Sequence, residues 1–485
     1  MMRFSRLVQL EQVRRTLAEA AAYLQDGGDS ELCQELMQNG AQMLEHTGTI
    51  LRQAQSDWKS NRPIEALEWV SSAWRMPLPG DMAERLEELG RSLREDIAVQ
   101  VRAVFFADLG GKWDAIDSVY RYMCEDPRFD PVVVLMPVYR ATQVSGETKT
   151  EVIYEDYLTG LGIPFLNYWE YDPAQDCPEL AFTSQPYESV TLPEFWAQNI
   201  AKYTRLVYLP YYIPSILNAS NQKILCDMPI HTYSWRVAGS SEKFAYYYRK
   251  YSRCRGKNLM VTGIPKMDYA VSLRENPCTI PKAWQSKIEG RVVLLWNTWY
   301  DGYASSLDLL QQVLPWFHEH QDFALIWRPH PMSKAVMKLY QPEQYRMLQE
   351  MMDTVPTFDN MVLDDGPECG PAFSCSSAQI SDFSAMMTQY LFLDKPLLWI
   401  QKPDKTLVNK EAEMHSKWIV SSSWMEKAST STDVIEFMER IARGEDRYRG
   451  VRGEVCSEDL PLADGNAATR ICNRLWEDLL QECFG

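Results

Sequence analysis

The sequence predicts an α/β protein with two facing Rossmann-like domains and an N-terminal helical segment. From residue 103 onward, short apolar runs alternate with stretches of helical period, which is the pattern of parallel βαβ units. The alternation starts again after the polar stretch 273–288, so we expect two successive blocks with a cleft between them. Before residue 100 the sequence shows helical period alone. The predicted boundaries are a helical segment over 1–100, a first Rossmann-like domain over 101–285 and a second, ligand-binding one over 286–485.

The helical segment is recognised by leucines at steps of three and four residues. They recur at Leu7, Leu10 and Leu17, and again from Leu86 onward after the breaker at 77–80. The first fifteen residues also carry four arginines (Arg3, Arg6, Arg14 and Arg15) against one glutamate. Two interpretations are open, peripheral contact with a membrane surface or the solvated face of a packed helix, and the second is favoured.

The elements of the two blocks follow in chain order. In the first block, strands are expected at 103–107, 132–137, 206–209 and 259–262, and helices at 113–124, 151–161 and between the last two strands. In the second block, strands are expected at 292–296, 324–327, 378–380 and 397–400, and helices at 306–318, 334–352, 383–393 and 467–482. Open α/β sheets bind ligands beyond the carboxyl ends of their strands, so the residues that follow these strands are the candidates for a site.

Composition excludes several classes of function. The 485 residues are 46% hydrophobic and 24% charged, which is ordinary for a globular protein, and the formal charge of −17 disfavours nucleic-acid binding. The apolar runs fall short of the roughly 20 residues of a membrane span, and no secretory signal is recognised, so we expect a cytoplasmic protein. The 11 cysteines include no CxxC pair, so we expect reduced thiols and no metal site.

The clearest candidate for chemistry is Arg328 with His330, directly after an apolar strand. In extended backbone these two residues point to the same side, and Pro329 and Pro331 hold the backbone rigid. A permanent cation beside a group that titrates near pH 7 suits phosphoryl transfer. We therefore predict that both are catalytic, although a structural histidine is the alternative.

A second candidate lies where a strand meets a helix at Ser381, Asp382 and Ser384. Free N–H groups at a helix start bind a diphosphate, and the two serines can add hydroxyl donors. Asp382 would repel phosphate, so it is either a helix cap or a partner for a hydroxyl or a cation.

Two further stretches are weaker candidates. Gly263, Pro265 and Lys266 form a turn in which glycine allows close approach and lysine reaches an anion. A helix is predicted within 243–257, and one of its faces carries Tyr246 together with three cations. This face is either a local site for an anionic acceptor or an ordinary solvated surface. These cations, called the basic stripe below, are Arg249, Lys250 and Arg253.

These elements occur in the order found in the CDP-glycerol glycerophosphotransferase family, which makes teichoic acid and related glycerol- or ribitol-phosphate polymers. The resembling motifs are Gly263-x-Pro265-Lys266-x-Asp268, Arg328-x-His330-Pro331, and Ser381-Asp382-Phe383-Ser384 followed by Tyr390 and Lys395-Pro396. The resemblance covers roughly residues 100 to 475. It implies a GT-B-like fold with the CDP-alditol donor held mainly by the second block.

The resemblance also implies roles for single residues. Arg328 and His330 match the catalytic element of the family, and Ser381, Asp382 and Ser384 match its donor diphosphate element. The family carries a second histidine in a His-Gly-Thr motif. Here the nearest candidate is His231, which is followed by Thr232 rather than by glycine.

The predicted reaction is transfer of glycerol phosphate, or a similar alditol phosphate, from CDP-glycerol to a hydroxyl of a cell-surface polysaccharide or teichoic-acid-like acceptor, with release of CMP. A nucleotide-sugar glycosyltransferase of the same architecture and an inactive, polymer-binding relative are the alternatives. The resemblance places such an enzyme in cell-envelope synthesis, at the inner face of the membrane. No resident cofactor is expected, while a loosely bound divalent cation stays open.

Overall fold

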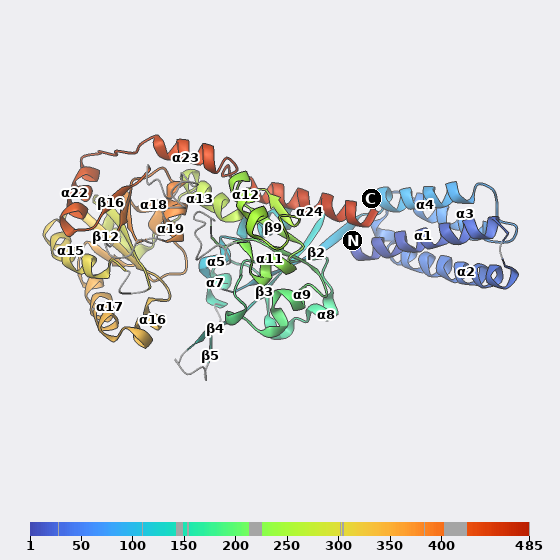
Figure 1. Cartoon of the computed structure of the whole chain (residues 1–485), viewed down its shortest axis with the longest axis horizontal. Coiled ribbons are helices and arrows are strands. Elements are labelled where there is room, and N and C mark those ends of the chain that lie inside the picture. The colour runs from blue at the N-terminus through green and yellow to red at the C-terminus, as the bar shows by residue number, and fades with distance from the viewer. Residues whose placement is uncertain are drawn as a thin grey trace.

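The computed structural model describes residues 1–27, 29–108, 110–141, 149–152, 155–212, 226–300, 302, 305–382, 384–401 and 424–484. A helical bundle and two sheet domains lie in a row, with the first sheet domain in the middle (Figure 1). Both large sheets are parallel and are flanked by helices, so the predicted fold class is confirmed.

The bundle packs its leucines inward. It consists of α1 (Phe4–Gln25), α2 (Ser30–Gln53), α3 (Arg62–Ala73) and α4 (Met82–Asp96). The predicted stripe residues Leu7, Leu10 and Leu17 share one buried cluster with those of α4. Arg3 binds Glu179 with 3.1 Å between Nη2 and Oε2, and Arg14 binds Glu11 and Glu87. Both of these arginine charges are therefore paired with carboxylates of the protein itself. None of the helices in the described ranges is long and apolar enough to span a membrane.

The first sheet has the strand order β10-β9-β8-β7-β2-β3-β6, with β1 (Met2–Arg3) beside β2. Its strands are β2 (Val99–Ala107), β3 (Phe129–Leu135), β6 (Phe165–Asn167), β7 (Leu180–Thr183), β8 (Arg205–Tyr208), β9 (Arg236–Gly239) and β10 (Leu259–Val261). Its helices are α5 (Gly110–Trp113), α6 (Asp117–Glu125), α7 (Glu155–Gly160), α8 (Pro173–Asp176), α9 (Ala197–Ile200), α11 (Pro229–Tyr233), α12 (Glu242–Tyr251) and α13 (Pro265–Glu275). A hairpin of β4 (Val138–Ala141) and β5 (Lys149–Val152) is separate.

Two element predictions for this domain are wrong. The long helix expected between 209 and 259 is replaced, where the chain is described, by α11, β9 and α12. The helix expected from 151 begins only at Glu155, because Lys149–Val152 pairs as β5. In both places backbone pairing with a neighbouring strand outweighs the local helical pattern.

The second sheet has the order β13-β12-β11-β14-β15-β16. Its strands are β11 (Val292–Thr298), β12 (Phe323–Pro329), β13 (Met361–Leu363), β14 (Ala378–Ser381), β15 (Leu397–Ile400) and β16 (Glu426–Ala428). Its helices are α14 (Lys282–Ile288), α15 (Leu307–Glu319), α16 (Ser333–Tyr340), α17 (Pro342–Thr354), α18 (Gly370–Cys375), α19 (Ala385–Leu391), α22 (Ser431–Ala442) and α23 (Val451–Asp459). The single helix expected over 334–352 is two, because Pro342 starts a new helix.

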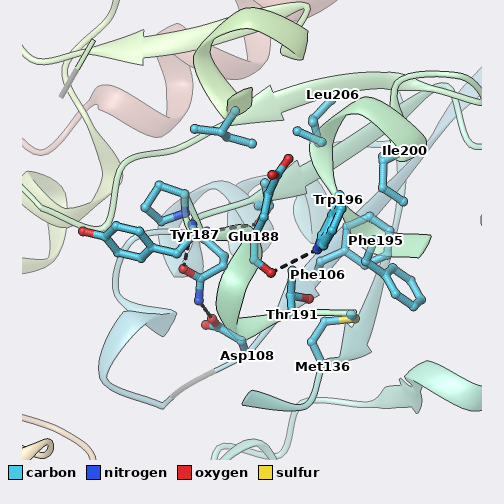
Figure 2. Close-up of a pocket in the computed structure, with 15 residues that line it drawn as sticks. Phe106, Asp108, Met136, Tyr187, Glu188, Thr191, Phe195, Trp196, Ile200 and Leu206 are labelled. Carbon is cyan, nitrogen blue, oxygen red and sulfur yellow. Dashed lines mark hydrogen bonds between the residues drawn. The ribbon is translucent and has the colours of Figure 1, made fainter. Parts of the chain in front are cut away.

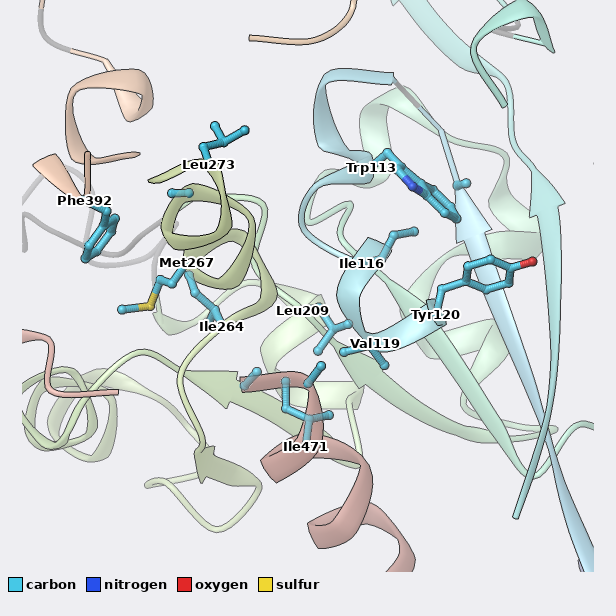
Figure 3. Close-up of a cluster of buried hydrophobic side chains, with 14 of the residues drawn as sticks. Trp113, Ile116, Val119, Tyr120, Leu209, Ile264, Met267, Leu273, Phe392 and Ile471 are labelled. Carbon is cyan, nitrogen blue, oxygen red and sulfur yellow. The ribbon is translucent and has the colours of Figure 1, made fainter. Parts of the chain in front are cut away.

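The final helix, α24 (Ala467–Phe484), returns from the second block to the first. It packs against α6 and α13, and Ile471 lies in the same buried cluster as Leu209 and Val119 (Figure 3). The same cluster joins the domains, since Phe392 lies near Met267 (Figure 3). The range 286–485, which the sequence pattern assigns to the second domain, thus includes a helix that packs on the first.

Candidate functional site

The site lies at the carboxyl ends of β12, β11 and β14, where the strand order of the second sheet reverses. In the sheet register, Asn297 is the neighbour of both Arg328 and Ser381. Side chains alternate along a strand, and Leu295 and Ile326 face the cluster shared with the first domain. Asn297 and Arg328, two residues further along, therefore share the face that looks toward the first domain.

Arg328 presents a buried cation at this edge. It is 8% exposed, and its Nη1 lies 2.8 Å from Oδ2 of Asp364, the residue that follows β13. The two charges attract, but their orientation does not make a hydrogen bond. Within the described residues both atoms lack a hydrogen-bond partner. The guanidinium is thus ion-paired inside the protein, and it is a permanent cation at the ligand edge of the sheet.

His330 is held by its backbone and by its ring. The backbone N–H donates to the carbonyl of Thr298 at 2.9 Å, and Nδ1 accepts the N–H of Met332 at 3.1 Å. Trp299 and Tyr300 pack on the imidazole, with ring centroids 5.1 and 5.0 Å away. Burial, together with the positive charge of Arg328, lowers the pKa of His330 to about 4. Near pH 7 the ring is therefore neutral and carries its proton on Nε2.

This tautomer changes what the histidine can do. The sequence prediction made His330 a proton acceptor or a cation on the phosphate. With Nδ1 occupied, the neutral ring offers an N–H donor to a ligand at Nε2. The positive charge of Arg328 acts on the ring of His330, whose pKa it lowers.

Asp382 holds a loop. Its buried carboxylate accepts the backbone N–H of Trp299 at 2.8 Å and that of Ser306 at 2.8 and 3.0 Å. It thereby caps the start of α15 on the neighbouring strand-helix unit and fixes Trp299 against His330. Burial raises its pKa to about 6. Asp382 does not cap the helix that follows it, α19, whose N-cap is Ser384; its partners are backbone N–H groups of another strand-helix unit.

The two serines of the same element differ in exposure. Ser381 is fully buried, and its hydroxyl donates to the carbonyl of Asp382 at 2.7 Å. Ser384 is half-buried at the N-cap of α19, 3.4 Å from the Ser381 hydroxyl. Ser384 is thus the one better placed to meet a ligand. Phe383 lies outside the described residues.

The turn with Gly263 contacts the protein itself. At φ +77°, a Cβ on Gly263 would lie 2.9 Å from the carbonyl oxygen of Leu462, so the glycine admits the chain that precedes α24. Pro265 is the first residue of α13. Asp268 of the same turn accepts the N–H groups of Ala467 and Ala468, both at 2.9 Å. The predicted close approach occurs, and a protein segment makes it.

Lys266 lies at the contact between the two domains. Its Nζ is 2.7 and 2.6 Å from the carboxylate oxygens of Asp114, which also accepts from Gln389 of α19 at 2.9 Å. The lysine charge is therefore balanced by a carboxylate. Asp114 joins the first domain to the helix that follows Ser384.

His231 lies in the core of the first domain. It is 1% exposed, its Nδ1 accepts the N–H of Met228 at 3.0 Å, and its ring packs on Tyr208 and Tyr248. Burial lowers its pKa to about 4. These contacts cap α11.

The basic stripe is exposed and partly neutralised. Arg249 lies 3.6 Å from Glu242, and Arg253 lies 3.1 Å from Asp227. Lys250 packs over the ring of Tyr251. Since α12 ends at Tyr251, Arg253 lies beyond the helix and not on its face as expected.

Three residues, Asp364, Asp114 and Gln389, were not predicted from the sequence. Asp364 follows the three-residue strand β13, whose short apolar run Met361–Leu363 was the available signal. Asp114 and Gln389 carry no local signal, since only the tertiary fold brings them together. Among the described residues no group of three or more His, Cys, Asp or Glu side chains is arranged to hold a metal ion.

Fold and site define a two-domain α/β protein of GT-B-like architecture with a buried arginine at the ligand edge of its second sheet. Residues 222–477 match the model of the CDP-glycerol:poly(glycerophosphate) glycerophosphotransferase family. The match spans more than half of the 485 residues, and the chain belongs to this family. The predicted resemblance is confirmed.

One curated relative is the teichoic acid glycerol-phosphate primase of Bacillus spizizenii (strain ATCC 23059 / NRRL B-14472 / W23). It is 24% identical over 165 residues, which are 34% of this chain and 39% of that protein. The match thus spans well under half of the relative's length.

Two solved structures share the fold. The S. aureus MnaA–UDP co-structure has a TM-score of 0.51 at 11% identity and covers 79% of this chain and 98% of its own. A protein from Listeria monocytogenes named a UDP-N-acetylglucosamine 2-epimerase has a TM-score of 0.52 at 9% identity, with the same coverage of 79% and 98%. At this identity the likeness shows the architecture alone.

Proposed function

We propose that this protein transfers glycerol phosphate, or a similar alditol phosphate, from CDP-glycerol to a hydroxyl of a teichoic-acid-like or related polysaccharide acceptor. The acceptor hydroxyl oxygen forms a bond to the glycerol-linked phosphorus and releases its proton to solvent, the bond from that phosphorus to the bridging oxygen breaks, and CMP leaves with that oxygen and the electron pair of the broken bond. Family membership supports the reaction class. The observation that carries the proposal is the buried cation of Arg328 at the ligand edge of the sheet, where its charge also acts on His330.

In this reaction Arg328 stabilises the charge that develops on the transferred phosphoryl group. His330 donates its Nε2 proton in a hydrogen bond to a phosphate oxygen, because its Nδ1 already accepts the N–H of Met332. The hydroxyl of Ser384 donates a hydrogen bond to the diphosphate of CDP-glycerol. The hydroxyl of Ser381, 3.4 Å away, helps to hold Ser384 in place.

The remaining residues of the predicted donor set act indirectly. Asp382 holds Trp299 against His330, and Lys266 holds Asp114 at the contact between the domains. Gly263 and Pro265 shape the turn on which α24 is seated. We propose that these residues maintain the cleft around the donor.

On the acceptor side, we propose that the basic stripe attracts an anionic acceptor. Arg249, Lys250 and Arg253 are exposed, and each extends from the first domain. The attraction by these cations acts only at short range, because at longer range the formal charge of −17 of the whole protein has the opposite sign.

We further propose that the protein works in the cytoplasm, at the inner face of the membrane. All 11 cysteines are free, which agrees with a reducing compartment. Fractionation of cells, followed by detection of the protein in the cytosolic and peripheral membrane fractions, tests this placement.

A second candidate function has a specific observation in its favour. The histidine that would supply the second catalytic group, His231, is 1% exposed and caps a helix. A protein that binds the donor without turning it over would have such an arrangement.

Two measurements separate the candidates. Thermal unfolding with CDP-glycerol and with a panel of UDP-, GDP- and CDP-sugars identifies the donor, and stabilisation by CDP-glycerol above the sugars is expected. CMP release across several phosphoglycosyl acceptors, with and without a chelator, then measures turnover and the contribution of a loosely held divalent cation. Stabilisation by a UDP-sugar alone would contradict the proposal, and binding without CMP release would favour the second candidate.

A further inference from the structure

A small pocket opens in the first domain, away from Arg328. It lies at the carboxyl ends of β2 and β7, where the order of the first sheet reverses. Aromatic side chains form much of its wall, and Asp108 and Glu188 supply carboxylates (Figure 2). The aromatic residues are Phe106, Tyr187, Phe195 and Trp196. The pocket holds about 30 Å³, which is room for two or so water-sized groups.

The two carboxylates differ in their partners. Asp108 binds Lys112, with 2.8 Å between Oδ2 and Nζ, and it also accepts from Gln185. Glu188 uses its backbone carbonyl, which accepts the indole N–H of Trp196 at 3.0 Å. Its carboxylate oxygen Oε1 is buried and has no hydrogen-bond partner in the part of the chain that the structure describes. A buried carboxylate oxygen without a donor is costly, so this atom marks a place for an incoming donor group.

We propose that this pocket binds the hydroxymethyl end of a glycerol-type polyol and thereby anchors the acceptor. Its O–H would donate to Glu188 Oε1, while its C–H groups pack on the aromatic wall. The size of the pocket admits an end group of two heavy atoms and not a sugar ring. The carboxylates of Asp108 and Glu188 repel a phosphate, so the neutral end of the acceptor enters. The acceptor role rests on the proposed function, whereas polyol binding does not.

Binding of glycerol to the intact chain, measured by ligand-observed NMR, tests the pocket directly. Glu188→Gln keeps the shape but replaces the charged acceptor by a neutral amide, so the dissociation constant for glycerol should rise about 3- to 10-fold. Glu194→Gln is the matched control, because Glu194 is an exposed glutamate in the same segment. The Glu194→Gln variant should bind glycerol with the affinity of the parent protein. If Glu188→Gln does not fold, Trp196→Phe, which removes the N–H bonded to Glu188, takes its place with the same expected direction.

Three results would overturn the inference: no glycerol binding by the parent protein, equal binding by Glu188→Gln and the parent, or tighter binding of choline than of glycerol. A kinetic measurement separates this inference from the proposed reaction. With a glycerol-terminated acceptor, Glu188→Gln should raise the acceptor KM by the same factor and leave the donor KM unchanged. Absence of CMP release with intact glycerol binding would refute only the reaction, and unchanged acceptor KM with normal CMP release would refute only the pocket.

Discussion

At the scale of single residues, burial decides what the histidines of this protein can do. His330 and His231 both accept a backbone N–H at Nδ1, and burial lowers the pKa of each to about 4. His330 faces the ligand edge of the second sheet beside Arg328. His231 lies in the first-domain core, where its ring packs on two tyrosines. The same arrangement caps a helix at His231 and leaves the Nε2 proton of His330 at the ligand edge of the second sheet.

His231 should make the protein sensitive to acid. Its pKa falls from an ordinary 6.5 to about 4 in the folded state, so the unfolded state binds the proton more tightly between these values. The free energy of unfolding should therefore drop by about 3 kcal/mol between pH 6.5 and 4 on account of this residue. In His231→Gln, this part of the pH dependence should be lost when unfolding by urea is measured across that range. The control variant His46→Gln changes an exposed histidine and should keep the pH dependence of the free energy of unfolding seen in the parent. The same pH dependence in His231→Gln and His46→Gln would show that His231 is not the residue responsible.

Ser384 should contribute to donor affinity. In the proposed role, Ser384→Ala removes a hydroxyl donor to the charged diphosphate, so the binding free energy of CDP-glycerol should weaken by roughly 1 to 2 kcal/mol. Calorimetric titration measures the change. Ser377→Ala, at an exposed serine before β14, should leave affinity unaltered. If Ser384→Ala binds CDP-glycerol as tightly as the parent, Ser384 serves only as the N-cap residue of α19.

At the scale of elements, Asp268 couples the Gly-x-Pro turn to the last helix. Its carboxylate accepts the first two N–H groups of α24, and Gly263 admits the chain just before that helix. The family turn thus has a structural task in addition to any contact with a ligand. Since α24 closes the cluster shared by both domains, loss of this cap affects the whole molecule.

Asp268→Ala should destabilise the protein by about 1 to 2 kcal/mol, which is the usual effect of losing a helix cap. Urea unfolding measures this difference, and limited proteolysis should cut first near 460–470. The exposed Glu350→Ala serves as the control and should unfold like the parent. Unchanged stability of Asp268→Ala would show that α24 is held without the cap.

The strands of the second sheet were predictable because parallel strands buried on both faces read as unbroken apolar runs. β11, β12, β14 and β15 were found in this way. Strands β6, β7 and β9 were missed, although β10, β14 and β15, which are as short, were found, so strand length alone does not decide what the pattern reveals.

The candidate site was predictable as far as it lies in one chain segment. Arg328 with His330 was found because the two are neighbours after a strand. The function of Asp382 was not resolved, since its partners Trp299 and Ser306 come from another strand-helix unit. Only the fold reveals that kind of contact.

At the scale of the whole molecule, electrostatics oppose an anionic acceptor. The formal charge of −17 repels a polyphosphate chain at long range, and the exposed cations of the basic stripe act against this field over a Debye length of roughly 8 to 10 Å. The proposed donor site is separate from these cations, because Arg328 belongs to the second sheet. Donor and acceptor binding should therefore respond differently to salt.

Reversal of the basic stripe to glutamate, at Arg249, Lys250 and Arg253 together, should raise the KM for an anionic acceptor. The donor KM should stay nearly constant. Added salt should shrink the difference between variant and parent, because it screens exposed charges. Steady-state kinetics at low and high ionic strength measure both effects. Equal acceptor KM in variant and parent would identify these cations as an ordinary solvated face.

The most direct test of the account is the rate of CMP release from CDP-glycerol by His330→Ala. A positioned hydrogen-bond donor to developing charge contributes about 10² to 10³ in rate, so kcat should fall by that factor while thermal unfolding and donor binding stay close to the parent. Arg328→Lys should also be impaired, since lysine loses the planar fork. His318→Ala, at an exposed histidine of the same domain, should keep parent kinetics. If His330→Ala releases CMP at the parent rate, or loses rate only in proportion to folded protein lost, the histidine is structural and the central claim is wrong.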